Sequence, residues 1–394
     1  MTFCLIIFVE YSLPIFDTGE DENKLALSLS TKYEHFDVHI CFNYLKIDGT
    51  IKSVEMFTHT FSFNKSGILI GTEISLNALY IVVISRYHVT LDVLVNDKVT
   101  IFPTPIHNSD YPYRATYMYH VITVCEVLGV CQIAISTACK DAFDITVNLK
   151  MEYSTCILLH DDASYTDGDS FNVTLSRYYM LKLQSHCDMS GTLIQSRKEL
   201  SVLSGGIMTV MGEGGRRQNF IGSTIPFSNA GQEYVVVGSN NSLFGDIIKI
   251  LTIEDNTILN IHGNEMKINK SSKVINRRID HGEVLYVKAD KAIQISQLSR
   301  NYLFHSVMTS LLPFRSSSLL LCDHDWVFIM KLKDTVVNNI EKNNSFTSNM
   351  IRIHGTEYVM SELTDNNACS NMQRQMVVVF NTKQSRYIEL MVSE

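Results

Sequence analysis

The sequence has little proline, no excess of positive charge and no long apolar run, and each lack excludes a class of protein. Only 6 of its 394 residues are proline, so proline-rich or collagen-like chains are excluded. The formal net charge of −8 argues against nucleic-acid binding, because phosphate contacts need a cationic surface. Internal apolar runs such as residues 78–84 are as long as a β-strand and far shorter than the roughly 20 residues of a membrane-spanning helix. With 45% hydrophobic and 19% charged residues, the chain is expected to be globular.

The first 16 residues are apolar and end at Asp17, which leaves two interpretations open. Their length fits the hydrophobic region of a secretory signal peptide, although Glu10 interrupts the run and no Lys or Arg precedes Lys24. The alternative is an N-terminal strand. We therefore treat residues 1–16 as a candidate signal peptide, 17–69 as an N-terminal β segment, and 70–394 as one β region with internal repeats.

Nine cysteines are present, without the paired C-x-x-C spacing of zinc sites. Eight remain if a leader that carries Cys4 is removed, which fits disulfides in an oxidising compartment. Spacing does not give the pairing, and buried free thiols are the alternative. Five N-glycosylation sequons permit secretion, at Asn64, Asn172, Asn240, Asn269 and Asn343.

Alternation of apolar and polar residues with a period of two runs through most of the chain and predicts an all-β fold. Three segments are predicted to be hairpins, namely residues 89–101, 248–261 and 284–295, because each joins two alternating runs through a short polar turn. The only segment that fits a helix is 334–344, and it is short.

One pattern recurs along the sequence. Residues 191–204 are followed by Ile225-Pro226-Phe227, and residues 284–296 are followed by Leu312-Pro313-Phe314. A fainter copy covers residues 121–159. Pro226 and Pro313 are the only prolines after Pro112, and both fall at the same place in the pattern. We therefore predict repeated antiparallel β modules, arranged either as propeller-like blades or as tandem β-sandwiches.

The recurring segments resemble the N-terminal domain family of the IgG Fc-binding protein. The resemblance rests on residues 196–202 and 289–295, on 225–236, on the turn at 252–261 and on the closing motif at 353–358, and together it spans residues 70–390. The chain departs from the family pattern in two places: residues 205–220 contain no cysteine pair, and residues 377–380 replace a glycine-tyrosine-glycine ending. The resemblance implies a secreted, mucus-associated glycoprotein that binds or scaffolds without catalysis. Immunoglobulin Fc is a partner by family name, but no residue here is identified as an Fc contact.

Three short segments carry residue types that could bind an ion. Residues 160–169 gather four carboxylates and a histidine, which suits Ca²⁺, but their spacing does not match an EF-hand and a solvated loop is the alternative. Residues 322–325 alternate across a strand, so few of them could share a metal. Residues 211–217 are glycine-rich and basic without the phosphate-loop pattern, which favours a hairpin tip.

A local basic run could contact an acidic glycan. It consists of Lys267, Lys270, Lys273, Arg277 and Arg278, and no acidic residue falls inside it. The alternative is a solvated strand edge protected by lysines.

These observations together predict an extracellular, non-enzymatic protein that recognises protein or glycan ligands, without a catalytic residue, a metal or a cofactor. The alternative function is a hydrolase on a β scaffold, such as a glycosidase, which would need two carboxylates that face each other across a groove.

Overall fold

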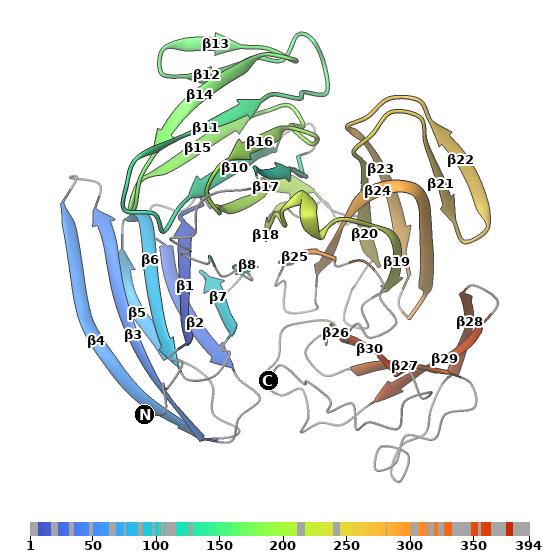
Figure 1. The fold of residues 1–394 in the computed structure, drawn as a ribbon, viewed down its shortest axis with the longest axis horizontal. Helices are drawn as coiled ribbons and strands as arrows, with labels where there is room; N and C mark the ends of the chain where they lie inside the picture. Colours follow the sequence, from blue (N-terminus) through green and yellow to red (C-terminus); the bar gives the residue numbers. More distant parts are fainter. Residues whose placement is uncertain are drawn as a thin grey trace.

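The computed structural model shows an all-β chain (Figure 1). It describes residues 7–16, 23–30, 35–46, 50–62, 68–74, 76–85, 90–96, 99–101, 103, 106, 116–125, 129–210, 217–238, 245–280, 282–300, 306–311, 313, 319–321, 327–332, 348–353, 356–363 and 376–380. Within these ranges the one helical element is a three-residue 3-10 turn at Phe227–Asn229. The predicted fold class is therefore confirmed.

Three modules share one arrangement of strands, which has eight strands in modules 1 and 2 and seven in module 3. Module 1 consists of β1 (Ile7–Pro14), β2 (Asn23–Ser30), β3 (His35–Lys46), β4 (Ile51–Ser62), β5 (Ile68–Ile74), β6 (Leu76–Ser85), β7 (Thr90–Val95) and β8 (Val99–Ile101). One of its sheets has the order β4-β3-β6-β1 and the other has the order β5-β2-β7-β8.

Module 2 repeats this arrangement. It consists of β9 (Tyr117–His120), β10 (Val130–Ser136), β11 (Phe143–Asn148), β14 (Ser170–Leu175), β15 (Met180–Ser185), β16 (Leu193–Ser196), β17 (Ser201–Val210) and β18 (Arg217–Ser223). Its sheets have the orders β14-β11-β16-β9 and β15-β10-β17-β18. Once the inserted strands β12 and β13 are set aside, these orders are the same as in module 1.

Module 3 makes the same pairings with one strand fewer. It consists of β19 (Gly231–Val237), β20 (Asp246–Thr252), β21 (Thr257–Ile261), β22 (Asn264–Ile268), β23 (Lys273–Ile279), β24 (Val284–Arg300) and β25 (Ser306–Ser310). The first half of β24 pairs with β19 and β21, and the second half pairs with β20 and β25. The long strand β24 thus occupies the positions that β16 and β17 occupy in module 2.

The repeat extends to buried hydrogen bonds. Tyr119 in β9 and Tyr234 in β19 are both buried, and each hydroxyl bonds to the backbone where the chain passes from one half of the module to the other. The Tyr119 hydroxyl accepts a bond from the Leu200 amide at 3.0 Å, and the Tyr234 hydroxyl donates to the Ile293 carbonyl at 2.7 Å. The internal repeat is therefore present in topology and in side-chain contacts.

The structure corrects the extent of the repeat. The segments 191–204 and 284–296 do occupy equivalent places, and Pro226 and Pro313 follow the equivalent strands β18 and β25. The fainter copy at 121–159 is not a separate unit, because it lies in module 2 together with residues 191–204. The further copy is module 1.

Two of the three predicted hairpins are wrong. Residues 90–101 form the predicted hairpin, β7 with β8. In the segment 248–261, however, β20 and β21 do not pair with each other but with different halves of β24, and residues 284–295 are part of that one continuous strand. Alternation reports that one face of a strand is buried, but it does not identify the neighbouring strand.

Each module encloses a core that is filled by apolar side chains. In module 2, Ile145 and Ile194 from one sheet meet Ile133 and Val202 from the other, and all four are almost fully buried. Equivalent cores fill modules 1 and 3. Of the two predicted arrangements, modules 1 and 2 are thus β-sandwiches, whereas in module 3 a single sheet curls through β24 to enclose its core.

The three modules meet at their last strands, β8, β18 and β25 (Figure 1). β25 pairs with β8 in parallel, which joins one sheet of module 1 to the sheet of module 3. The Ser310 hydroxyl of β25 donates to the Ser223 carbonyl of β18 at 2.6 Å. On β18, Phe220 packs against module 3 and Ile221 packs against module 1, so this strand is buried on both faces.

A further sheet follows module 3. It consists of β26 (Leu319–Leu321), β27 (Val327–Leu332), β28 (Ser348–Ile353), β29 (Thr356–Leu363) and β30 (Met376–Phe380), in the order β26-β30-β27-β29-β28. β27 and β30 are parallel, and the other pairs are antiparallel. The candidate helix at 334–344 lies outside the described residues.

Residues 7–16 are part of the folded core. β1 pairs with β6 over eight residues, and Tyr11, Leu13, Ile15 and Phe16 are buried. The division at residue 69 stays a prediction, and it falls within β5 of module 1. We propose that the natural divisions are the ends of the three modules, because each module encloses its own core.

Candidate binding surface

Module 2 carries a long connection that the equivalent positions of modules 1 and 3 do not have. Between β11 and β14 the chain makes an excursion over residues 149–169, which we call the inserted hairpin. It contains β12 (Leu158–His160) and β13 (Ala163–Tyr165), which pair with each other. The equivalent connections are only residues 47–50 and 262–263.

A disulfide and an ion pair fix the inserted hairpin to module 2. Cys156 is bonded to Cys187, and the Glu152 amide donates to the Asp188 carbonyl at 3.0 Å. The Lys150 ammonium lies 3.0 Å from Asp167, whose carboxylate also accepts the Met151 amide at 2.8 Å. Burial by itself raises the pKa of Asp167, but the bonds from Met151 and Lys150 outweigh it and hold that pKa below its usual value.

The inner side of the inserted hairpin packs on the sandwich. Leu158 is fully buried, and the rings of Tyr165 and His160 lie 4.4 Å and 5.3 Å from the ring of Phe171, measured between centroids. The hairpin is therefore held at its base and along one side.

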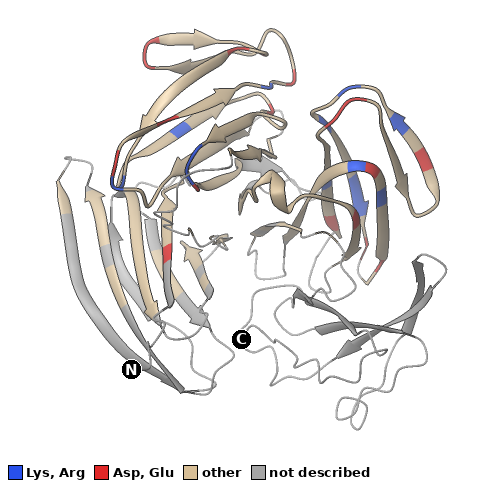
Figure 2. Ribbon diagram, in the orientation of Figure 1, with Lys and Arg blue, Asp and Glu red and all other residues tan. Residues whose placement is uncertain are grey.

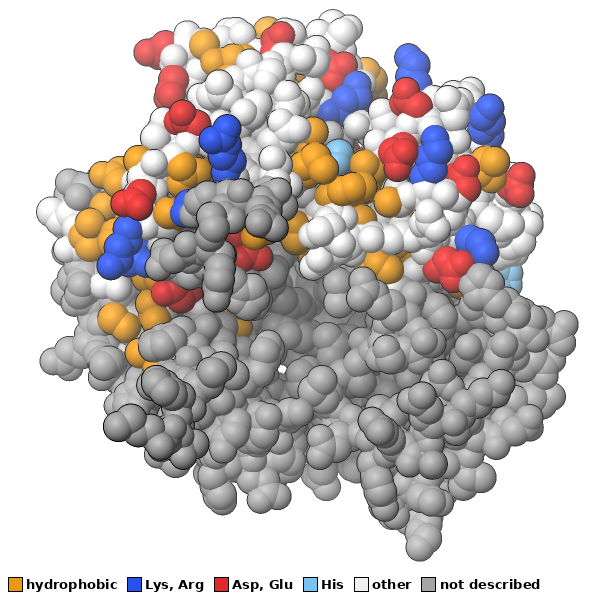
Figure 3. All heavy atoms as spheres, viewed as in Figure 1, with side chains coloured by type: hydrophobic (Ala, Val, Ile, Leu, Met, Phe, Trp, Pro, Cys, Tyr) orange, Lys and Arg blue, Asp and Glu red, His pale blue; other side chains and the backbone are white. Residues whose placement is uncertain are grey.

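The outer side of the inserted hairpin exposes apolar side chains. Leu159 is 74% exposed, Tyr153 is 59% exposed and Ile157 is 57% exposed. Ile157 and Leu159 flank the buried Leu158, because alternate residues of an extended chain point to opposite faces. Figure 3 shows orange side chains over this hairpin at the top of the molecule, with acidic side chains beside them.

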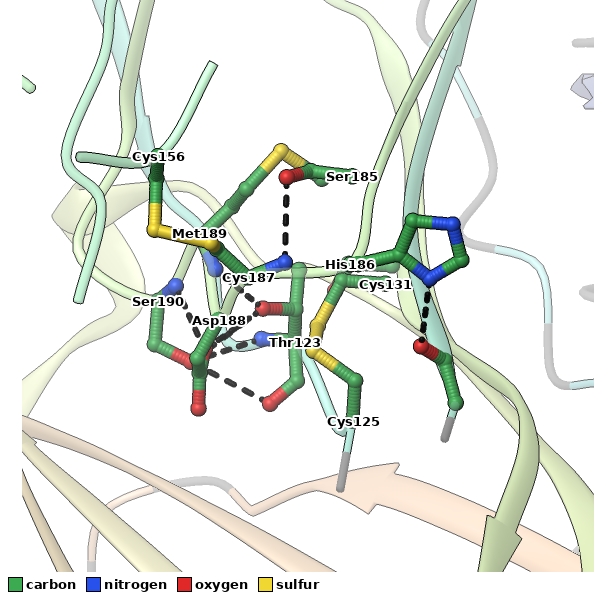
Figure 4. Close-up of a disulfide and its surroundings, with 12 residues drawn as sticks. Thr123, Cys125, Cys131, Cys156, Ser185, His186, Cys187, Asp188, Met189 and Ser190 are labelled. Carbon is green, nitrogen blue, oxygen red and sulfur yellow. Dashed lines mark hydrogen bonds between the residues drawn. A yellow bond between two sulfur atoms is a disulfide. The ribbon is translucent and has the colours of Figure 1, made fainter. Parts of the chain in front are cut away.

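A buried polar cluster supports the loop at which the disulfide ends (Figure 4). The Asp188 carboxylate accepts the Thr123 hydroxyl at 2.7 Å and the Ser190 amide at 2.8 Å. Lys249 from β20 of module 3 donates to Asp188 at 3.1 Å and to the Thr123 carbonyl at 2.7 Å. This cluster, which we call the Asp188 clamp, joins modules 2 and 3.

The positive charge of Lys249 favours the ionised form of the Asp188 carboxyl. Burial raises the pKa of Asp188, but the Lys249 ammonium and the hydrogen bonds from Ser190 and Thr123 outweigh burial and hold that pKa below its usual value. The second disulfide, Cys125–Cys131, lies beside Thr123 (Figure 4). The Cys156–Cys187 disulfide and the clamp therefore fix the loop to which the inserted hairpin is attached.

Comparison with known protein families identifies the family of the chain. A family model described as IgGFc binding protein matches residues 136–385, which is more than half of the chain. The chain belongs to the IgGFc-binding protein family. The comparisons with curated proteins and with solved structures found no match.

Membership of the IgGFc-binding family confirms the predicted resemblance and supports a binding-type, non-enzymatic role at the level of the family. The matched region includes the inserted hairpin and all of module 3. No helix among the described residues is long and apolar enough to cross a membrane.

The predicted basic run of this family member is spread over two strands that do not pair with each other. Lys267 lies on β22, Lys270 lies in the following turn, and Lys273, Arg277 and Arg278 lie on β23, which pairs with β20. All five are exposed. Arg277 and Arg278 lie 4.0 Å from Glu283 and 3.6 Å from Asp280, and Figure 2 shows blue and red residues mixed in module 3. The acidic-glycan site stays a prediction, and acidic neighbours offset part of its charge.

Two of the five sequons can be placed. Asn172 lies on β14 and Asn269 follows β22, and both are exposed. The Thr146 hydroxyl donates to the Asn172 side chain at 2.8 Å. Asn64, Asn240 and Asn343 lie outside the described residues, and glycosylation at all five stays a prediction.

The acidic residues at 160–169 do not converge on one point. Asp167 bonds to Lys150 and Met151, whereas Asp169 accepts the Thr166 amide at 2.6 Å in its own turn. Across the described residues, no three His, Cys, Asp or Glu side chains come together as metal ligands would. Residues 322–325 and most of the glycine-rich segment, 211–216, lie outside the described part of the chain.

The sequence did not reveal the exposed apolar surface. Residues 156–159 close the fainter copy at 121–159 as an unbroken apolar run, and nothing in that run marks Ile157 and Leu159 as exposed. The feature of the sequence that could have indicated this surface is the long connection between the segments of β11 and β14, which contains a cysteine. Long connections in compact domains are often functional.

Proposed function

We propose that this member of the IgGFc-binding family is an extracellular, non-enzymatic binding protein that recognises protein ligands through the inserted hairpin of module 2. The observation that carries the proposal is a disulfide-fixed hairpin that exposes Tyr153, Ile157 and Leu159. Binding energy at protein interfaces concentrates in a few aromatic and apolar side chains on rigid supports, because little conformational entropy is then lost on binding.

The extracellular setting is supported by the two disulfides. Cys125–Cys131 and Cys156–Cys187 fit an oxidising compartment, since cytosolic thiols are kept reduced. Non-reducing peptide mapping of the protein from its native source is expected to show both cross-links. Eight or nine free thiols would contradict the extracellular assignment.

Protein is favoured over glycan as the ligand by the chemistry of the surface. The residues of the inserted hairpin that are exposed carry apolar, acidic and hydroxyl side chains but no basic one, whereas an acidic glycan needs cationic groups. A glycan role of the basic run in module 3 remains a separate proposal.

The binding proposal is tested by capture from mucosal fluid with identification by mass spectrometry. The test variant carries Tyr153→Ser, Ile157→Ser and Leu159→Ser, and the matched control carries Ile258→Ser and Met266→Ser, which replace the exposed apolar residues of module 3. We expect the wild type and the control to capture the same identified proteins, before and after enzymatic deglycosylation of the fluid, and the test variant to lose them. Equal capture by all three proteins would refute the assignment of the hairpin.

A further inference from the structure

We propose that the inserted hairpin docks onto a cationic protein surface, with Tyr153, Ile157 and Leu159 in the centre of the contact and a rim of carboxylates around them. This inference rests on the proposed function and adds the chemistry of the partner.

The apolar centre is concentrated in sequence and in space. Tyr153, Ile157 and Leu159 are three of the seven large hydrophobic side chains that are exposed among the described residues, and they fall within seven consecutive positions. The Cys156 amide donates to the Tyr153 carbonyl at 3.0 Å, which closes the turn that leads into Ile157. Single exposed hydrophobics are common on protein surfaces, but a group on one fixed turn is typical of a docking site.

The fixed backbone lowers the entropic cost of binding. Cys156, which is bonded to Cys187, stands directly before Ile157, and Leu158 is anchored in the core of module 2 between the two exposed side chains. Only side-chain rotamers remain to be ordered when a partner binds.

The charge of the inserted hairpin is predominantly negative. Residues 150–169 contain five carboxylates and one lysine, which leaves a net formal charge of −4 with histidine neutral. Lys150 is engaged with Asp167. The other four carboxylates, Glu152, Asp161, Asp162 and Asp169, belong to exposed residues.

This charge determines which partner fits. Complementary potentials attract a cationic protein surface and orient it, whereas anionic partners and anionic membranes are repelled. An apolar tip that inserts into lipid normally has basic neighbours, which interact with the lipid headgroups. The acidic rim therefore favours a cationic protein over a membrane.

The test uses the full chain and two peptide probes, one in which leucine and lysine alternate and one in which leucine and glutamate alternate. We expect the protein to bind the leucine–lysine peptide more tightly, with an affinity that falls as salt is added. Leu159→Ser is expected to weaken binding about tenfold, because one large apolar side chain leaves the contact. Asp161→Asn with Asp162→Asn is expected to weaken binding and to reduce its salt dependence.

Matched controls come from module 3. Met266→Ser and Glu265→Gln replace exposed residues on β22, the strand equivalent to β14, and they are expected to leave affinity unchanged. Thermal unfolding of each variant reports whether its fold is intact. Equal weakening by the module 3 variants, or equal affinity for the two peptides, would overturn the proposal.

Two further outcomes separate this inference from the proposed function. Leu159-dependent binding to zwitterionic or anionic lipid vesicles, without binding to the leucine–lysine peptide, would replace the protein partner by a membrane. If proteins captured from mucosal fluid are lost with the triple variant but prove to be acidic, protein binding by the hairpin stands and the cationic partner is wrong.

Discussion

The Asp188 clamp offers a sharp test of how modules 2 and 3 are held together. Replacement of Asp188 by alanine leaves Lys249, which is only 6% exposed, as a buried charge without its carboxylate partner. Such a change costs about 3–5 kcal/mol, and we expect about 3 kcal/mol because the Asp188 side chain keeps 22% of its surface exposed. Lys249→Met is expected to cost about 2 kcal/mol, since Asp188 retains its bonds from Thr123 and Ser190.

Urea unfolding followed by circular dichroism measures these costs. The double variant is expected to cost less than the sum of the single variants, because each change relieves the unpaired partner left by the other. Lys288→Met is the matched control. It breaks a pair with Glu233 at 3.2 Å in which the lysine side chain is 47% exposed, and we expect it to cost less than about 1 kcal/mol. Additive costs for Asp188 and Lys249, or a cost equal to that of the control, would refute the clamp.

The clamp also predicts a dependence on pH. The pKa of Asp188 is lower in the folded protein than in the unfolded chain, so the unfolded chain takes up the proton first as the pH falls. The stabilisation is complete above the unfolded pKa of about 3.9 and is lost as the pH falls from there through the folded value. Asp188→Asn is expected to reduce the loss of stability in this acid range, which unfolding curves at several pH values would show.

Three other predictions concern stability. Burial lowers the pKa of His120 to about 4, so stability is expected to fall by up to about 3 kcal/mol as the pH drops from about 6.5 through that value. His120→Phe should remove this loss in pH-dependent unfolding, and an unchanged profile would argue against it. Removal of the Cys156–Cys187 bond, which spans 31 residues, is expected to cost about 3.7 kcal/mol of stability through loop entropy, whereas removal of the Cys125–Cys131 bond, which spans 6, should cost about 2.2 kcal/mol. Calorimetry of the two alanine double variants measures both costs, and a larger cost for Cys125–Cys131 would contradict the reasoning. A variant that begins at residue 17 loses the four large apolar side chains Tyr11, Leu13, Ile15 and Phe16 from the core, each contributing about 1.5–3 kcal/mol, and is expected not to fold. Solubility and circular dichroism measure this, with a variant that has a separate signal peptide fused before residue 1 as the control.

The strands themselves were readable from the sequence. Alternating runs such as residues 90–95 place every second side chain against a core, and this requirement appears directly in the order of the residues. The recurrence of Pro226 and Pro313 marked two module ends, because the chain leaves equivalent strands at these points. Module 1 was missed, since its likeness to the other modules lies in strand pairing and not in matching residues.

What only the tertiary structure decided is which strands are neighbours and which apolar residues stay exposed. β20 and β21 follow each other closely yet pair with different halves of β24 and not with each other, because pairing depends on backbone bonds between distant segments. Ile157, Leu158 and Leu159 are alike in the sequence, but the disulfide and the core fix Leu158 inward and turn its two neighbours outward. Composition and alternation therefore determined an all-β chain, while the binding surface arose from the packing of an insertion against a sandwich that the sequence does not show.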